Sequence, residues 1–220
     1  MKKIKKILII LSCLFCLPTS FVTANEPERS GKGITIKFKE LSFETNDYKA
    51  GDVVISYDQK GLKEYVHIFD ATTKQLLETM SVEKTGYRNS NIRPWIFKRS
   101  SSYGNTKIEL SINVELYNYG SFREIVSLRG HYLTIAESVT DTRLENYNVN
   151  VWSPKDRFPT LTLSYIYNGT LVAVVNNAIN ASAKFDLLGA GFSISRTEGR
   201  NTYYRRTFDS TGQINLYEKH

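Results

Sequence analysis

The strongest structural signal in the sequence is the run Thr160-Leu-Thr-Leu-Ser-Tyr-Ile-Tyr-Asn-Gly-Thr-Leu-Val-Ala-Val-Val-Asn-Asn177. β-Branched, aromatic and aliphatic residues flank Asn168-Gly169, and both of these residues tolerate the positive φ angles of a type I′ turn. The run therefore predicts a β-hairpin with its turn at Asn168-Gly169. Apolar side chains occupy both faces of this hairpin, so we expect it to lie inside the fold as the core of the C-terminal sheet.

Short strand patterns separated by turn signals fill most of the remaining chain. The longest alternation runs from Ile108 to Leu116, with apolar residues at even positions, and predicts one dry face and one wet face. Tyr65–Asp70 and Gln75–Val82 predict a second hairpin, connected through Asp70 and the threonines that follow it.

Further turns are predicted at Arg129-Gly130, Gly189–Gly191 and Asp209–Gly212, and the segment Ala183–Leu188 is counted as a strand. About fourteen short strands result, with little helix outside the N-terminal segment. The predicted fold is all-β, an antiparallel β-sandwich, either as one sandwich or as two β lobes.

Two segments have no clear pattern. Residues 83–105 read as an irregular stretch, and a boundary between two lobes would fall near Ser100–Asn105, separating an N-terminal β region (34–104) from a C-terminal one (105–220). Glu137–Asn146 reads as a loop or a single helical turn, with Asp141 as its N-cap.

The N-terminus reads as a bacterial signal peptide over residues 1–24. Four lysines precede an apolar run from Ile7 to Leu17, and Val22-Thr23-Ala24 places small residues before the expected cleavage site. A lipoprotein signal with acylation at Cys13 is the alternative. The apolar run is too short for a permanent membrane span, so we expect a secreted or wall-associated protein with a flexible leader at 25–33.

Removal of the signal changes the charge and the cysteine content. It takes away four lysines and no acidic residue, which lowers the net charge from +7 to +3 and leaves both signs interspersed along the chain. This pattern argues against nucleic-acid binding. Cys13 and Cys16 are the only two cysteines, so the mature chain has no thiol for catalysis, disulfides or metal binding.

No local motif indicates catalysis, a metal or a cofactor. The three histidines, His67, His131 and His220, lack metal-ligand spacing, and no Gly-x-Ser-x-Gly sequence occurs. His67 shares a predicted strand face with Tyr65 and Phe69, which favours a packed or rim position. We therefore predict no catalytic residues, no metal and no cofactor.

Two clusters of aromatic and basic residues are candidates for ligand contact. The first consists of Tyr87, Arg88, Arg93 and Trp95 in the irregular stretch, where a loop on a β scaffold could present them to a partner. The second lies between Arg200 and Arg206, but strand alternation would divide it between two faces.

These features favour a non-enzymatic extracellular protein that binds a cell-wall polymer or a surface protein. Two alternatives remain open at this level. One is an extracellular hydrolase whose carboxylates are assembled by the fold, and the other is a structural protein that pairs through a sheet edge. The sequence does not determine the oligomeric state.

Overall fold

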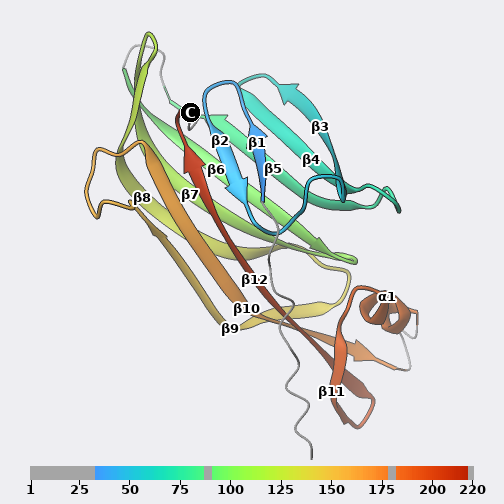
Figure 1. Cartoon of the computed structure of the whole chain (residues 1–220). Helices are drawn as coiled ribbons and strands as arrows, with labels where there is room; N and C mark the ends of the chain where they lie inside the picture. The colour runs from blue at the N-terminus through green and yellow to red at the C-terminus, as the bar shows by residue number, and fades with distance from the viewer. Residues whose placement is uncertain (1–32, 87–90, 178–181, 218–220) are drawn as a thin grey trace, which may run out of the picture. The chain divides into compact units, whose positions relative to one another are not determined.

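The computed structural model describes residues 33–86, 91–177 and 182–217. Gly31–His220 form one compact unit, and the predicted signal peptide lies outside the described residues. The described residues form twelve strands and one helix (Figure 1). Their bounds are β1 Ile34–Lys37, β2 Ser42–Thr45, β3 Val53–Lys60, β4 Lys63–Asp70, β5 Leu76–Lys84, β6 Ile92–Tyr103, β7 Thr106–Tyr119, β8 Phe122–Glu137, β9 Asp141–Trp152, β10 Thr162–Asn176, α1 Ala183–Gly189, β11 Ser193–Glu198 and β12 Asn201–Asn215.

The strands form two antiparallel sheets of six strands each, which confirms the predicted all-β sandwich. The first, here called the meander sheet, takes β3 to β8 in chain order. The second sheet has the order β1-β2-β12-β10-β9, and β11 also pairs with β12 (Figure 1). The two termini of the described chain, β1–β2 and β12, therefore lie side by side in the second sheet.

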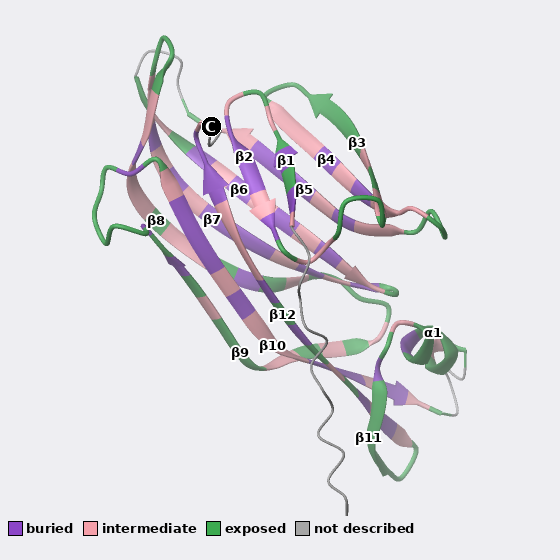
Figure 2. Ribbon diagram, viewed as in Figure 1, coloured by how far each residue is buried: buried purple, intermediate pink, exposed green. Residues whose placement is uncertain are grey.

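The core lies between the two sheets. In β7 the residues Ile108, Leu110, Ile112, Val114 and Leu116 are all buried, as the alternation predicts (Figure 2). Phe43 of β2 meets Phe97 of β6 edge-on, with ring centroids 6.1 Å apart, so aromatic packing joins the sheets.

The predicted hairpin at Asn168-Gly169 is wrong. β10 runs straight through these residues and pairs with β12 along its whole length, from Thr162↔Asn215 to Asn176↔Asn201, while β9 pairs on its other side. Pairing on both edges satisfies far more backbone groups than folding the strand back on itself would. Local turn chemistry is overridden by these long-range partners.

Gly169 is required here for close packing and not for a turn. An added Cβ would lie 2.8 Å from Cβ of Tyr147 and 2.9 Å from Cζ of Phe208. The β9 strand accommodates the position with a bulge, and Asn146 within that bulge has φ of 48°.

The prediction that this run lies inside the fold is confirmed for one face. Because β10 is continuous, its odd-numbered residues share one face, and those with side chains from Leu163 to Val175 are buried. The opposite face is half-buried in most positions, and Ser164 and Val172 on it are buried.

Two other predicted glycine turns are also strand interiors. Gly212 lies within β12, where an added Cβ would overlap the hydroxyl of Tyr165 and the carbonyl oxygen of Glu44. Gly130 lies within β8 beside a register shift, where the backbone of Arg129 is the extra residue with no register partner on β7. Close packing in one case and a β-bulge in the other account for glycines that resemble turn residues.

The predictions for two further segments need correction. Ala183–Leu188 is helical and not a strand, since Ala, Lys and Leu are good helix formers and Leu187 buries itself against the core. The region Glu137–Asn146, predicted as a loop or helical turn, contains the last residue of β8, a short connection and the first half of β9. Strand pairing with β10 fixes that half.

The β4–β5 hairpin is confirmed. Oδ1 of Asp70 accepts the backbone N–H groups of Thr72 at 2.9 Å and Thr73 at 2.6 Å. These two bonds, with Thr73 the stronger contributor, hold the pKa of Asp70 below its ordinary value.

The irregular stretch of the prediction contains β6, and this is a correction as well. The proposed lobe boundary near Ser100–Asn105 falls at the tip of the β6–β7 hairpin, whose strands pair from Ile92↔Tyr117 to Tyr103↔Thr106 within the meander sheet. The N-terminal and C-terminal β regions both contribute strands to the second sheet.

Candidate functional site

The residues of the first predicted binding cluster have three different positions. Tyr87 and Arg88 lie outside the described residues. Arg93 is half-buried near the start of β6, and Trp95, two positions further on, is only 2% exposed. The indole of Trp95 packs edge-on against Phe97, with ring centroids 6.3 Å apart, and Nζ of Lys84 lies 4.8 Å above it. Trp95 is therefore a core residue whose ring cannot stack on a ligand.

The second cluster divides between two faces, as the alternation predicts. Tyr204 is buried, and the guanidinium of Arg206 lies 4.5 Å from the ring centre of Tyr103. On the opposite face Arg205 pairs with Glu145 at 2.8 Å. Arg205 and Arg206 therefore have partners within the fold, and the cluster does not form a single basic patch.

The densest cluster of polar side chains was not predicted. Arg99 of β6 is 2% exposed, and its Nε and Nη2 donate to the two carboxylate oxygens of Glu78 on β5, which is fully buried. Nη2 also donates to Oδ2 of Asp47 at 2.5 Å. Nη1 donates to the hydroxyls of Tyr165 at 3.1 Å and Ser210 at 2.5 Å.

The charges in this cluster stabilise one another. Burial acts to lower the pKa of Arg99, but the attraction of Glu78 and the neighbouring tyrosines raises it well above the ordinary value. Burial, and next Glu78, raises the pKa of Tyr48, whose hydroxyl donates to Oε2 of Glu78 at 2.8 Å. All five N–H groups of Arg99 can be assigned an acceptor. The cluster joins the two sheets, and Arg99 has no donor left for a ligand.

A more open arrangement lies on the outer face of the second sheet. Trp152, the last residue of β9, is 37% exposed and stands opposite Ser164 of β10, which in turn stands opposite Gln213 of β12. It borders a shallow pocket of about 410 Å³. We call this surface the Trp152 face and define it by Trp152, Asn150, Ser164, Ile166, Thr211 and Gln213.

Hydrogen bonds order the polar side chains around the indole. Nε2 of Gln213 donates to Oγ of Ser164 at 3.3 Å, and Asn215 links Thr162 to Glu44 through bonds of 2.9 Å and 2.8 Å. The result is an aromatic ring on a rigid sheet next to amides, hydroxyls and a carboxylate. This combination suits a ligand that has an apolar face and many hydroxyl groups, such as a sugar ring.

The sequence prediction does not include Trp152, because no basic residue lies within two positions of it, whereas Arg93 lies two positions before Trp95. A usable signal exists in the alternation of β9, where Tyr147, Val149 and Val151 occupy one set of positions and two asparagines the other. Trp152 follows in the asparagine register, and an aromatic residue among exposed amides is a mark of a binding surface.

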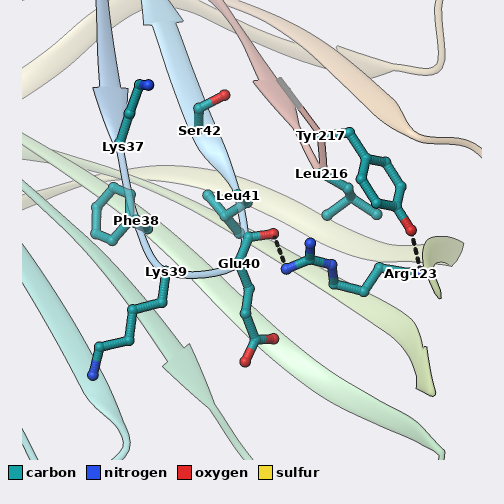
Figure 3. A pocket seen from close by; sticks show the side chains of 9 residues that line it. All are labelled: Lys37, Phe38, Lys39, Glu40, Leu41, Ser42, Arg123, Leu216 and Tyr217. Carbon is teal, nitrogen blue, oxygen red and sulfur yellow. Dashed lines mark hydrogen bonds between the residues drawn. The ribbon is translucent and has the colours of Figure 1, made fainter. Parts of the chain in front are cut away.

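Two further pockets flank the turn between β1 and β2. The smaller, of about 210 Å³, lies among residues of β1, the β1–β2 turn, β2, Arg123 at the start of β8, and Leu216 and Tyr217 after β12 (Figure 3). The larger, of about 360 Å³, shares Lys37, Phe38 and Lys39 with it and extends to Tyr57 and other residues of the β3–β4 hairpin.

The larger of these two pockets contains two carboxylates that do not converge. Asp58 stands opposite Tyr65, while Glu64 stands opposite Gln59, so the two acids project from opposite faces of the meander sheet. Oε2 of Glu64 accepts the backbone N–H of Lys39 at 3.0 Å. This pocket does not assemble the carboxylate pair that the hydrolase alternative needs.

His67 packs as the strand pattern predicts. Its ring stacks on Tyr65, with centroids 6.2 Å apart, and its Nδ1 lies 3.1 Å from Oγ1 of Thr79. Within the part of the chain that the structure describes, no group of three His, Cys, Asp or Glu side chains could hold a metal ion. In the same part no helix has the length and apolarity needed to span a membrane.

No family model, curated protein or solved structure matches this chain.

Proposed function

We propose that the mature chain is a secreted bacterial protein that binds a polysaccharide of the cell surface or cell wall without modifying it. The observation that carries this proposal is the Trp152 face, where an exposed indole lies beside ordered amides and hydroxyls on a rigid sheet. The signal-peptide pattern of residues 1–24 supports a location outside the cytoplasmic membrane.

The ligand contacts follow from the chemistry of the face. The indole of Trp152 stacks on the apolar face of a sugar ring, while the Asn150 amide and the Thr211 hydroxyl exchange hydrogen bonds with ring hydroxyls. The wider surface continues along β9 and β10 through Asn148 and Asn168, which stand opposite each other in the register. A linear polymer could therefore contact several successive positions.

A co-sedimentation assay with purified cell walls tests this proposal. The mature chain should pellet with the walls, and Trp152→Ala should weaken binding by about 30-fold, which corresponds to about 2 kcal/mol for a central aromatic contact. Tyr119→Ala is the matched control, because Tyr119 is a more exposed aromatic residue at the β7–β8 turn of the meander sheet and is not among the residues that define the Trp152 face. Equal pelleting of the wild type and Trp152→Ala would contradict the proposed site, and no pelleting of the wild type would contradict the function.

A further inference from the structure

The small pocket beside the β1–β2 turn contains an arginine with unused donors. Nη1 of Arg123 donates to the backbone carbonyl of Glu40 at 2.8 Å, and its guanidinium lies 5.2 Å from the ring centre of Tyr217. Its Nε is buried and has no hydrogen-bond partner among the described residues. No carboxylate among the described residues forms an ion pair with Arg123.

The contrast with Arg99 shows that these unused donors need an explanation. Both arginines are at least half-buried, but Arg99 finds acceptors on Glu78, Asp47, Tyr165 and Ser210. A structural arginine is expected to be satisfied in this way, since a shielded donor without an acceptor costs free energy. The unmet donors of Arg123 are those of a residue that receives its acceptor from outside the chain.

The one acid that lines the pocket, Glu40, is turned away from Arg123. The carboxylate of Glu40 is held by Nζ of Lys84 and by Nδ2 of Asn118, the latter at 2.8 Å. Figure 3 shows the guanidinium of Arg123 directed at the backbone of Glu40, while the Glu40 side chain points in another direction. The Glu40 charge is thus balanced by Lys84 and does not neutralise the pocket.

The net charge of the lining residues is positive. Lys37, Lys39 and Arg123 are cationic against the one acid Glu40, so long-range attraction favours a negative ligand, although Figure 3 shows the Lys37 and Lys39 ammonium groups directed away from Arg123. Ser42, a potential hydroxyl donor, lines the same space. A volume of about 210 Å³ is smaller than that of a typical pocket for a drug-sized ligand, and it suits a compact charged group.

We propose that this pocket binds an oxyanion, the carboxylate or phosphate group of a ligand, through the terminal Nη N–H groups of Arg123, for which the described residues supply only the Glu40 carbonyl as an acceptor. The planar guanidinium presents paired donors that match either group. Tyr217 and the Glu40 carbonyl fix the plane of the guanidinium before the ligand arrives. The adjoining pocket of about 360 Å³, which shares Lys37, Phe38 and Lys39, has room for the rest of the molecule beside Tyr57.

The test is an NMR titration of the ¹⁵N-labelled mature chain with sodium phosphate and, separately, with sodium acetate, at ionic strength held constant with sodium chloride. The Arg123 Nε–H signal and the backbone amides of Lys39 and Leu41 should shift and saturate. Saturation with phosphate alone assigns a phosphate site, with acetate alone a carboxylate site, and with both a general oxyanion site. Shifts that do not saturate with either anion, or that chloride reproduces, would overturn the proposal.

Two variants complete the test. Arg123→Lys keeps the charge but loses the paired donors, so the apparent affinity should fall about tenfold. Arg157→Lys, a change at an exposed arginine in the loop before β10, should leave it unchanged. If Arg123→Lys alters the spectrum of the whole fold, the saturable shift of the wild-type Nε–H signal remains decisive. Trp152→Ala should still bind the anion, which separates this site from the polysaccharide proposal.

Discussion

Replacing Arg99 with methionine should destabilise the mature chain strongly. The change removes a guanidinium whose side chain is 2% exposed and leaves the fully buried carboxylate of Glu78 without its two-point partner. Breaking a buried ion pair from one side costs about 3–5 kcal/mol, because an uncompensated charge stays in the interior. For a chain of this length, about 2–4 °C of melting temperature corresponds to each kcal/mol, so the midpoint should fall by about 6–20 °C.

The assay is urea and thermal unfolding of a protein comprising residues 25–220, followed by circular dichroism. Arg129→Met is the matched control, because Arg129 also pairs with a glutamate, Glu115, but its side chain is 63% exposed. An exposed pair contributes only about 0–1 kcal/mol. The double variant Arg99→Met/Glu78→Leu should recover much of the loss, since it removes the orphaned charge together with its partner. A loss below about 1 kcal/mol for Arg99→Met, or a double variant as unstable as the sum of the single ones, would refute the reasoning.

Two further predictions concern the glycines and the β4–β5 turn. Gly212→Ala and Gly169→Ala should each lower the free energy of unfolding in urea by about 1–3 kcal/mol, because the added methyl group overpacks the site. In Gly130→Ala the new Cβ meets nothing within 4 Å, so the free energy of unfolding should change by less than about 1 kcal/mol. A similar loss for all three variants would contradict this explanation. The folded pKa of Asp70 is depressed, so its contribution to stability is present above about pH 4 and lost as the pH falls through the folded value. Asp70→Ala should therefore lower the unfolding midpoint at neutral pH and weaken its dependence on pH in the acid range, and identical pH profiles for the variant and the wild type would contradict the role of the turn.

The sequence predicts those parts of the fold that depend on neighbours along the chain. The alternation in Ile108–Leu116 determines which face of β7 is dry, and Asp70 caps the turn that follows it through bonds to residues two and three positions away. Asn168-Gly169 shows the limit of local reasoning. These two residues favour a tight turn in isolation, but β9 and β12 pair along both edges of β10 and hold it extended. No local sequence pattern reveals those partners.

The candidate sites depend on contacts that are distant in sequence. Arg99 and Ser210, which are hydrogen-bonded, lie 111 positions apart in the sequence. Arg123, whose backbone N–H donates to the Tyr217 hydroxyl, lies 94 positions from that residue. The basic neighbours of Trp95 favour a binding role, but its position in β6 directs it into the core. Trp152 lies on the more exposed face because residues 148–152 alternate without interruption after the bulge near Asn146. Alternation alone places Trp152 on the polar face, whereas its neighbours on β10 and β12 come only from the sheet.

Tryptophan fluorescence can read the proposed ligand contact at a single residue. The sequence contains two tryptophans, and a Trp95→Phe variant leaves Trp152 as the sole indole emitter. Titration of this variant with soluble cell-wall polysaccharide should shift the emission to shorter wavelength and saturate, because sugar stacking removes water from an indole that is 37% exposed. An emission spectrum that stays constant up to polymer excess, in a variant shown to be folded, would contradict polysaccharide binding on the Trp152 face.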